Sequence, residues 1–356
     1  MSYRRCVFIL IGTLLFFAGV NYLVWKLWTE ELLTENRGNG GDLTRMGYVS
    51  DSKSPRKNSA DLPSRHLEGI EYRGGPIDMV TIGDSFSHGA AGGKNRYYQD
   101  YIATLSAIKV VNLPSLKLPN EDDEKSHFTT ILKLANSGWL RDREVKYVLL
   151  QSTEWLCIER FKRKFNLAES DDSARLSDLF KTYRKKYELP DVGFINNGNL
   201  KWLIQPISYR FSGRDFNGKV YKTTLDRDFF TVKDRRTLLF FHKNINITPK
   251  FSLNDVKEMN DNLNCLAEIL AKQGIKLVFM PCVDKYNLYS DFIVNNAFPK
   301  SSFFEQLRPL PKSYRFIDTK AILTAEVRNG IKDIYYADDS HWSWKATEAI
   351  FTVEKF

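Results

Sequence analysis

The stretch IDMVTIGDSFSHG at residues 77–89 indicates what kind of fold this chain adopts. Its first part, residues 77–82, is typical of a short β-strand, and Gly83 ends it. Further short runs rich in Val, Ile, Leu and Phe are expected to form strands at 108–113, 146–151, 275–281 and 315–318.

Helical stretches lie between these runs. Helices are expected over 126–138 and 252–274, the second opening with the capping-box pair Ser252 and Asp255, and Ser343 caps the last helix. Short apolar strands that alternate with helices favour an α/β fold with a parallel sheet covered on both faces. Such sheets place their active sites at the carboxyl ends of the strands.

Residues 6–25 form an uncharged, apolar run of 20 residues. As a helix this run spans roughly 30 Å, the thickness of a bilayer's hydrocarbon core. Basic residues precede it and acidic residues follow it, which predicts a cytoplasmic N-terminus. We therefore expect a single-pass anchor in the inner (cytoplasmic) membrane, with the C-terminal domain in the periplasm or outside the cell. A cleaved signal peptide and a buried helix are the alternatives.

The chain divides by composition into a cytoplasmic N-terminus with the anchor (1–33), a flexible linker rich in Gly, Ser, Lys and Pro (34–75), and an α/β domain (76–356). Residues 156–250 are expected to be a basic insertion, mostly helical around 176–187, with 20 Lys and Arg against 11 Asp and Glu. The insertion is either a solvated basic face or a surface for an anionic glycan or phospholipid headgroups. The expected compartment disfavours nucleic acid.

Composition excludes several classes of protein. Hydrophobic residues make up 43% of the chain, which excludes wholesale disorder. Four cysteines in 356 residues exclude a disulfide-stapled miniprotein, and no His or Cys spacing matches a zinc module. Cys157, Cys265 and Cys282 can form at most one intramolecular disulfide among them.

Two segments carry residues suited to chemistry. Ser85 follows the strand at 77–82, where its hydroxyl can act as a nucleophile and its own N–H can stabilise an oxyanion. In YADDSHWS (336–343), His341 stands two and three residues after a pair of aspartates, a spacing that suits a base and its orienting acid. The simpler interpretations are an ordinary turn and an acidic loop before a helix.

Together these segments resemble a known superfamily. The matching sequences are similar to the SGNH (GDSL-type) hydrolases, and most of all to the SGNH-like acetyltransferase domains of the alginate O-acetylation family: GDSF (83–86), YVLLQSTEW (147–155), LVFMPCVDKYNLY (277–289) and DDSHWS (338–343). The resemblance covers roughly residues 76–152 and 275–350. It implies the SGNH fold, a flavodoxin-like three-layer sandwich around a parallel sheet.

The resemblance also implies roles for four residues. Ser85 would be the acyl-accepting nucleophile and His341 the general base. A D-x-H-W pattern selects Asp339 as the orienting acid, and a D-x-x-H spacing selects Asp338; we favour Asp339.

The oxyanion hole departs from the superfamily pattern. The usual glycine and asparagine are replaced within residues 112–115 and 151–154. Gln151 or Ser152 is therefore the candidate to complete the hole beside the Ser85 amide. Lys285 lies just after the fourth strand, at the expected active edge, and is either a substrate contact or a solvated lysine; we favour the solvated lysine.

The expected function is a membrane-anchored extracytoplasmic O-acyltransferase, specifically an O-acetyltransferase, that modifies a cell-surface or exported polysaccharide through an acyl-Ser85 intermediate. The resemblance implies a membrane-bound O-acyltransferase partner as acyl donor, and we expect neither a cofactor nor a metal. The alternatives are a carbohydrate esterase with the same triad and a non-catalytic glycan-binding assembly subunit.

Overall fold

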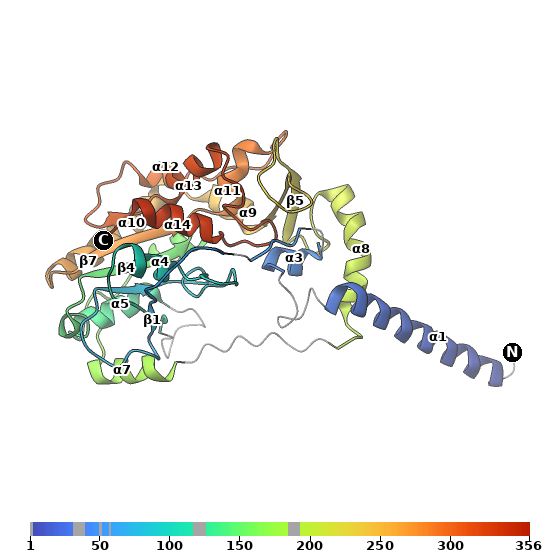
Figure 1. Cartoon of the computed structure of the whole chain (residues 1–356), viewed down its shortest axis with the longest axis horizontal. Helices are drawn as coiled ribbons and strands as arrows, with labels where there is room; N and C mark the ends of the chain where they lie inside the picture. The colour runs from blue at the N-terminus through green and yellow to red at the C-terminus, as the bar shows by residue number, and fades with distance from the viewer. Residues whose placement is uncertain (1–2, 31–39, 50–51, 57, 117–125, 184–192) are drawn as a thin grey trace. The chain divides into compact units, whose positions relative to one another are not determined.

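The computed structural model describes residues 3–30, 40–49, 52–56, 58–116, 126–183 and 193–356 (Figure 1). The chain forms two compact units, each built from three stretches of sequence. Unit 1 comprises Met1–Pro55, Lys186–His242 and Tyr336–Ser340, and unit 2 comprises Arg56–Lys185, Lys243–Tyr335 and His341–Phe356.

Unit 2 is built on a parallel sheet of six strands in the order β1-β3-β2-β4-β7-β8. The strands are β1 (Leu67–Glu68), β2 (Met79–Ile82), β3 (Val110–Asn112), β4 (Tyr147–Thr153), β7 (Lys276–Cys282) and β8 (Arg315–Phe316). Five of them are the strands expected from the sequence, and β2, β3, β4 and β7 are almost wholly buried. The expected α/β class with a parallel sheet is confirmed.

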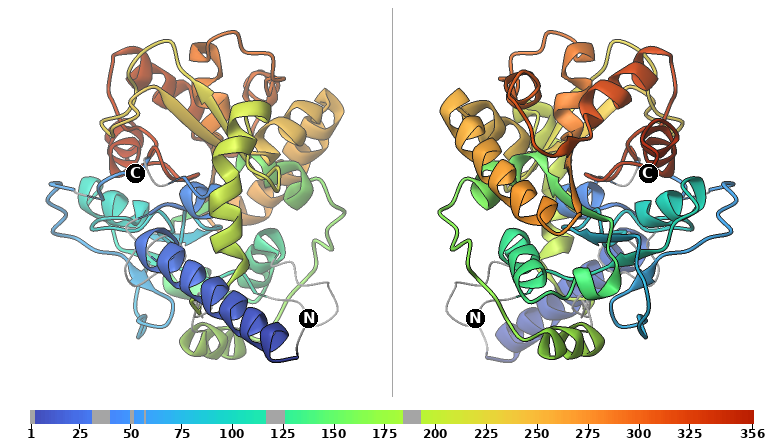
Figure 2. Two further views of the ribbon diagram at one scale, coloured as in Figure 1. Left: turned by 90° about the vertical axis from the view of Figure 1, so that its right-hand side faces the viewer. Right: turned by 90° about the vertical axis from the view of Figure 1, so that its left-hand side faces the viewer.

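Two groups of helices cover the two faces of this sheet (Figure 2). One group is α4 (Tyr98–Leu105), α13 (Thr319–Arg328) and α14 (Trp344–Val353), and the other is α5 (His127–Asn136), α6 (Glu154–Phe161) and α10 (Leu253–Ala271). The expected caps are present: Ser126 accepts a hydrogen bond from the Thr129 N–H, Ser252 forms a capping box, and Ser343 caps α14.

Shorter elements complete unit 2. They are α7 (Ser173–Thr182), α9 (Lys243–Asn246), α11 (Lys285–Tyr289), α12 (Phe303–Leu307) and the 3-10 turns η2 (Arg141–Arg143), η3 (Thr248–Lys250) and η4 (Ser290–Phe292).

Unit 1 contains α1 (Tyr3–Val24), the π-helical turn η1 (Trp25–Thr29), α3 (Asp42–Gly47), α8 (Asn197–Ser212) and an antiparallel hairpin of β5 (Val220–Thr224) and β6 (Thr237–Phe241). Its small core holds Leu43, Val49, Val220 and Leu239, with Tyr209 of α8 packed against it.

The N-terminal helix is long and apolar enough to cross a membrane. It runs from Tyr3 to Thr29, its mean hydropathy reaches 2.3, and almost none of it is buried against other parts of the chain. The expectation of a membrane-spanning length is confirmed.

Two expectations about domain organisation are wrong. The described part of the expected linker 34–75 is folded, because α3 and β1 lie within it and Leu43 and Tyr72 are buried. A two-residue strand and a six-residue helix are too short to give an apolar period in the sequence.

The basic stretch 156–250 is also not a single insertion. Its first part belongs to unit 2, its residues from Lys186 to His242 belong to unit 1, and it includes the β5–β6 hairpin. The helix expected around 176–187 ends at Thr182, and residues 184–187 lie outside the described residues.

Candidate active site

The turn after β2 brings Ser85 to the carboxyl edge of the sheet of unit 2. β2 ends at Ile82, and Gly83 follows it in close contact with two side chains. A Cβ atom at position 83 would lie 2.2 Å from the Ser87 Oγ and 2.3 Å from the Gln151 Oε1. A residue with a Cβ atom at position 83 would therefore displace the Ser87 and Gln151 side chains.

The structure brings Ser85 and His341 together although 256 residues separate them in the sequence. The His341 Nε2 lies 2.7 Å from the Ser85 Oγ, within hydrogen-bond distance. His341 is only 8% exposed, and the ring centroid of Phe86 lies 4.7 Å from that of the imidazole. A base held this close to a hydroxyl is suited to take its proton.

The ends of a short loop position His341. Tyr335 and Trp342 form an antiparallel bridge, and the Ser343 N–H donates to the Ile334 carbonyl at 2.8 Å. Ser343 then caps α14. His341 is therefore the last residue of the loop that this bridge closes, and the capped helix α14 begins shortly after it.

The two candidate orienting acids belong to unit 1. One carboxylate oxygen of Asp338 accepts a hydrogen bond from the Gly41 N–H at 2.9 Å, and Asp42 accepts from the Ser340 N–H at 2.7 Å. Asp338 and Asp339 are both buried. The assignment of Asp339 as the acid that orients His341 stays a prediction, with Asp338 as its alternative.

Four donors converge on the carboxylate of Asp84, the residue before the serine. It accepts hydrogen bonds from the Arg160 guanidinium at 2.6 Å, the Thr153 N–H at 2.8 Å, the Gln151 amide at 2.9 Å and the Phe86 N–H at 3.3 Å. Burial alone would raise the pKa of Asp84, but the Arg160 charge and the Thr153 N–H hold that pKa at about 2. The turn that carries Ser85 is thus tied to β4 and α6.

The oxyanion role expected for Gln151 is not supported by the geometry. Its amide nitrogen already donates to Asp84 and to the Cys282 sulfur, and an amide nitrogen has only two hydrogens. Its oxygen accepts from the Asp84 N–H at 2.9 Å. Gln151 instead holds the turn after β2 in place.

Ser152, the other expected oxyanion donor, is also engaged. Its hydroxyl donates to the Thr153 carbonyl at 3.2 Å and accepts from Arg160 at 2.9 Å. The Ser85 N–H differs, because it makes no hydrogen bond to any residue that the structure describes. It is therefore available to an oxyanion formed at Ser85.

A pair of buried carboxyl groups lies at the carboxyl ends of β4 and β7. Glu154 accepts hydrogen bonds from the Asp284 N–H at 2.9 Å and from Asn287 at 3.0 Å. Burial raises the pKa of Glu154, and burial together with the Glu154 charge raises that of Asp284 well above its usual range. The expectation that the adjacent Lys285 is solvated is wrong, because Lys285 is 1% exposed.

The cysteines contribute no disulfide: all four are free thiols. Cys157 and Cys282 are buried, and burial raises the pKa of both thiols well above its usual range. The role of Arg160 was not predicted from the sequence: the aspartate of the GDS turn indicates that a buried carboxylate needs a charged partner, but not that Arg160 is this partner.

Comparison with protein-family models and with curated proteins finds no match for this chain.

Proposed function

We propose that this protein is a membrane-anchored extracytoplasmic O-acyltransferase, specifically an O-acetyltransferase, that acylates hydroxyl groups of a cell-surface or exported polysaccharide. The observation that carries the proposal is the 2.7 Å distance between the His341 Nε2 and the Ser85 Oγ at the carboxyl edge of the sheet. The Ser85 N–H, which has no hydrogen-bond partner among the described residues, supports it, since acyl transfer requires a donor for the developing oxyanion.

The reaction proceeds in two half-reactions. In the first, His341 accepts the hydroxyl proton, the Ser85 Oγ bonds to the carbonyl carbon of the donor ester, and the donor's alkoxide leaves with that proton. In the second, His341 takes a proton from a sugar hydroxyl, whose oxygen attacks the acyl carbon, and returns the proton to Ser85 as its ester bond breaks. The predicted role of Asp339 is to hold the proton on the other imidazole nitrogen.

The sheet topology supports an SGNH-type fold. The order β3-β2-β4-β7-β8 corresponds to the 2-1-3-4-5 order of flavodoxin-like sheets. In such sheets ligands bind where the strand order reverses, which here is between β2 and β4. Ser85 follows β2 and is adjacent to Asp84 in the chain, and Thr153, the last residue of β4, donates its N–H to Asp84.

The proposed location is the inner membrane, with α1 as a single span, a cytoplasmic N-terminus, and the chain that follows the span in the periplasm or cell exterior. Because acetyl-CoA is cytoplasmic, a membrane-bound O-acyltransferase partner would supply the acyl group across the bilayer. The length and hydropathy of α1 support the anchor.

Trapping of the acyl-enzyme tests the nucleophile. We expect the full chain in detergent to cleave a chromogenic acetyl ester and to carry an acetyl adduct on the peptide that contains Ser85. Ser85→Ala should remove the adduct and lower the rate by about three orders of magnitude. Ser64→Ala, which changes an exposed serine of the same unit, is the matched control. An adduct that survives Ser85→Ala would refute the proposal.

Addition of an acceptor separates transfer from hydrolysis. With oligosaccharide present, an acyltransferase should release the chromogenic alcohol faster and place the acetyl group on sugar. An esterase with the same triad should release acetate at a rate that no acceptor changes. Polysaccharide acetylation that persists in cells with Ser85→Ala would favour the non-catalytic assembly role.

A further inference from the structure

Helix α8 presents an apolar face to solvent. Leu200, Leu203, Ile207 and Phe211 are 63%, 48%, 59% and 82% exposed. Their spacing of three, four and four residues places them in one stripe along the helix. We call this set the α8 stripe, and we propose that it lies in the headgroup region of the phospholipid bilayer that α1 crosses.

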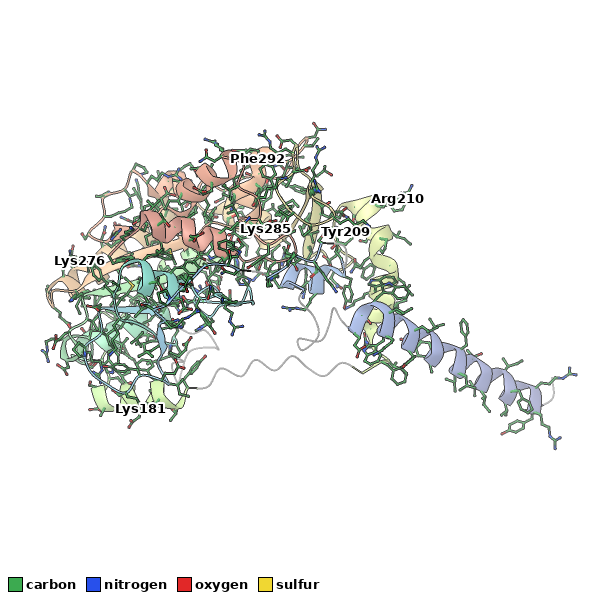
Figure 3. All side chains as sticks on the ribbon, viewed as in Figure 1. Lys181, Tyr209, Arg210, Lys276, Lys285 and Phe292 are labelled. Atoms are coloured by element: carbon green, nitrogen blue, oxygen red, sulfur yellow. The ribbon has the colours of Figure 1, made fainter. Side chains whose placement is uncertain are left out.

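The opposite side of α8 packs against other parts of unit 1. Gln205 is buried and accepts a hydrogen bond from the Phe216 N–H at 2.8 Å. Tyr209 donates to the Gly47 carbonyl at 3.1 Å. Its side chain lies on the side of α8 that faces α3 and β5, and Arg210 points away from that side (Figure 3). The α8 stripe is therefore a second apolar surface that the core of its own unit does not use.

Exposed apolar residues concentrate around this helix. Outside α1 and η1, the described residues include 13 exposed large hydrophobic side chains, and seven of them fall between residues 194 and 216. Besides the α8 stripe, these are Phe194, Ile195 and Phe216. A concentration of this kind is typical of an interaction surface, since scattered exposed apolar residues need no partner.

Contacts with α1 set the depth of α8 relative to the span. Asn199 in the first turn of α8 donates to the Asn21 side chain at 3.0 Å and accepts from Thr29 at 2.5 Å. The rings of Trp28 and Trp202 stack with centroids 4.4 Å apart. α8 thus begins beside the end of α1 (Figure 1), at a level where Trp side chains mark the membrane interface.

The charge of α8 suits anionic lipid. The helix contains Lys201 and Arg210 and no acidic residue, and Arg214 follows it. An amphipathic helix with apolar and basic sides binds at the interface through buried area and attraction to anionic headgroups. The occupant of the α8 stripe is therefore the bilayer surface and not a second protein. The inference rests on α1 spanning the membrane and not on the chemistry at Ser85.

The test uses the full chain in nanodiscs of phosphatidylethanolamine and phosphatidylglycerol. Cys6→Ala and Cys265→Ser remove the exposed thiols. An environment-sensitive fluorophore is then attached at Phe211→Cys in the α8 stripe or at Ser212→Cys, an exposed neighbour off the stripe. These exposed positions leave the core unchanged.

We expect the probe at position 211 to be quenched several-fold more by nitroxide lipid, and several-fold less by aqueous iodide, than the probe at 212. Equal iodide quenching at both positions would overturn the proposal. Shielding of position 211 from iodide without quenching by nitroxide lipid would also overturn it, and would indicate a protein partner. Absence of an acyl-Ser85 adduct in the same preparation would leave the inference standing.

Discussion

Asp84 and Arg160 define the chemical environment of the serine beside them. Arg160 is 19% exposed and Asp84 is 8% exposed in their side chains, so the ion pair is largely removed from water. With its pKa held at about 2, the Asp84 carboxylate keeps its charge and cannot serve as a base near neutral pH. The group that we propose as the proton acceptor is His341, whose Nε2 lies 2.7 Å from the Ser85 Oγ.

Arg160→Met should reduce turnover through the position of Ser85. Loss of the guanidinium leaves a buried carboxylate uncompensated, which costs about 3 kcal/mol of stability and shifts the turn. We expect kcat for ester cleavage to fall by about 100-fold with KM little changed, because the substrate loses no direct contact. Steady-state kinetics and urea unfolding measure the two effects.

The matched control is Lys164→Met, which removes one exposed positive charge just beyond α6. An Arg160→Met enzyme with unchanged kcat would contradict the positioning role.

The pH dependence of the unfolding free energy gives a second check on the Asp84–Arg160 ion pair. Because the folded-state pKa of Asp84 lies below its usual value of 3.8, its contribution to stability is present above about pH 4 and is lost as the pH falls toward 2.

At the scale of elements, the edge strand β1 depends on side chains as much as on its backbone. It is two residues long and pairs with β3 through Leu67 and Glu68. His66 lies 2.7 Å from Asp100 and 3.3 Å from Glu68, and Glu68 accepts from Asn112 at 3.1 Å. Asn112 also donates to the Ser87 carbonyl, so this network connects β1 to the turn of the serine.

Stability should fall at alkaline pH because of His66. Burial alone would lower its pKa, but hydrogen bonds to Asp100 and Glu68 raise it from 6.5 to about 9. The contribution is therefore full below about pH 6.5 and is lost as the pH rises through 9. A shift of this size corresponds to roughly 3 kcal/mol.

Unfolding of the wild type and His66→Gln, compared from pH 6 to pH 10, measures this contribution. Gln cannot titrate, so the difference in unfolding free energy between the two proteins should shrink across that range. A difference independent of pH would show that folding does not raise the pKa of His66.

At the scale of the whole molecule, the chain passes repeatedly between its two units. Unit 1 contains the N-terminal segment with the anchor, the segment with α8, and the five residues Tyr336–Ser340. After each of these three segments the chain continues in unit 2. The proposed topology places unit 2, and the parts of unit 1 that follow the span, on the side of the membrane opposite the N-terminus.

Cysteine labelling tests that topology. Cys265 of α10 is exposed, whereas Cys157 and Cys282 are buried. In Gram-negative cells with a permeabilised outer membrane and an intact inner membrane, a membrane-impermeant maleimide should label the protein at Cys265. Cys265→Ser should abolish that labelling, and labelling that appears only after the inner membrane is lysed would reverse the orientation.

Much of the fold was predictable from the sequence because its signals are local. The strands β2, β3, β4 and β7 lie in apolar runs, and the caps at Ser126, Ser252 and Ser343 satisfy donors within the next few residues. The span of α1 is equally local, since it depends only on length and the absence of charge. The motifs around Ser85 and His341 also predicted that these two side chains lie close together.

Other features depended on contacts that no short window of sequence contains. The Arg160 side chain reaches Asp84 from 76 residues away, and Gln151 reaches it from 67, so neither role can be inferred from neighbouring residues. Lys285 was expected in solvent and is buried, and β1 exists only through its partners on β3. Hydrophobic period and capping are properties of adjacent residues and can be recognised along the chain. The pairing of buried charges and the burial of a lysine are decided by which distant segments pack together, and only the tertiary structure contains that information.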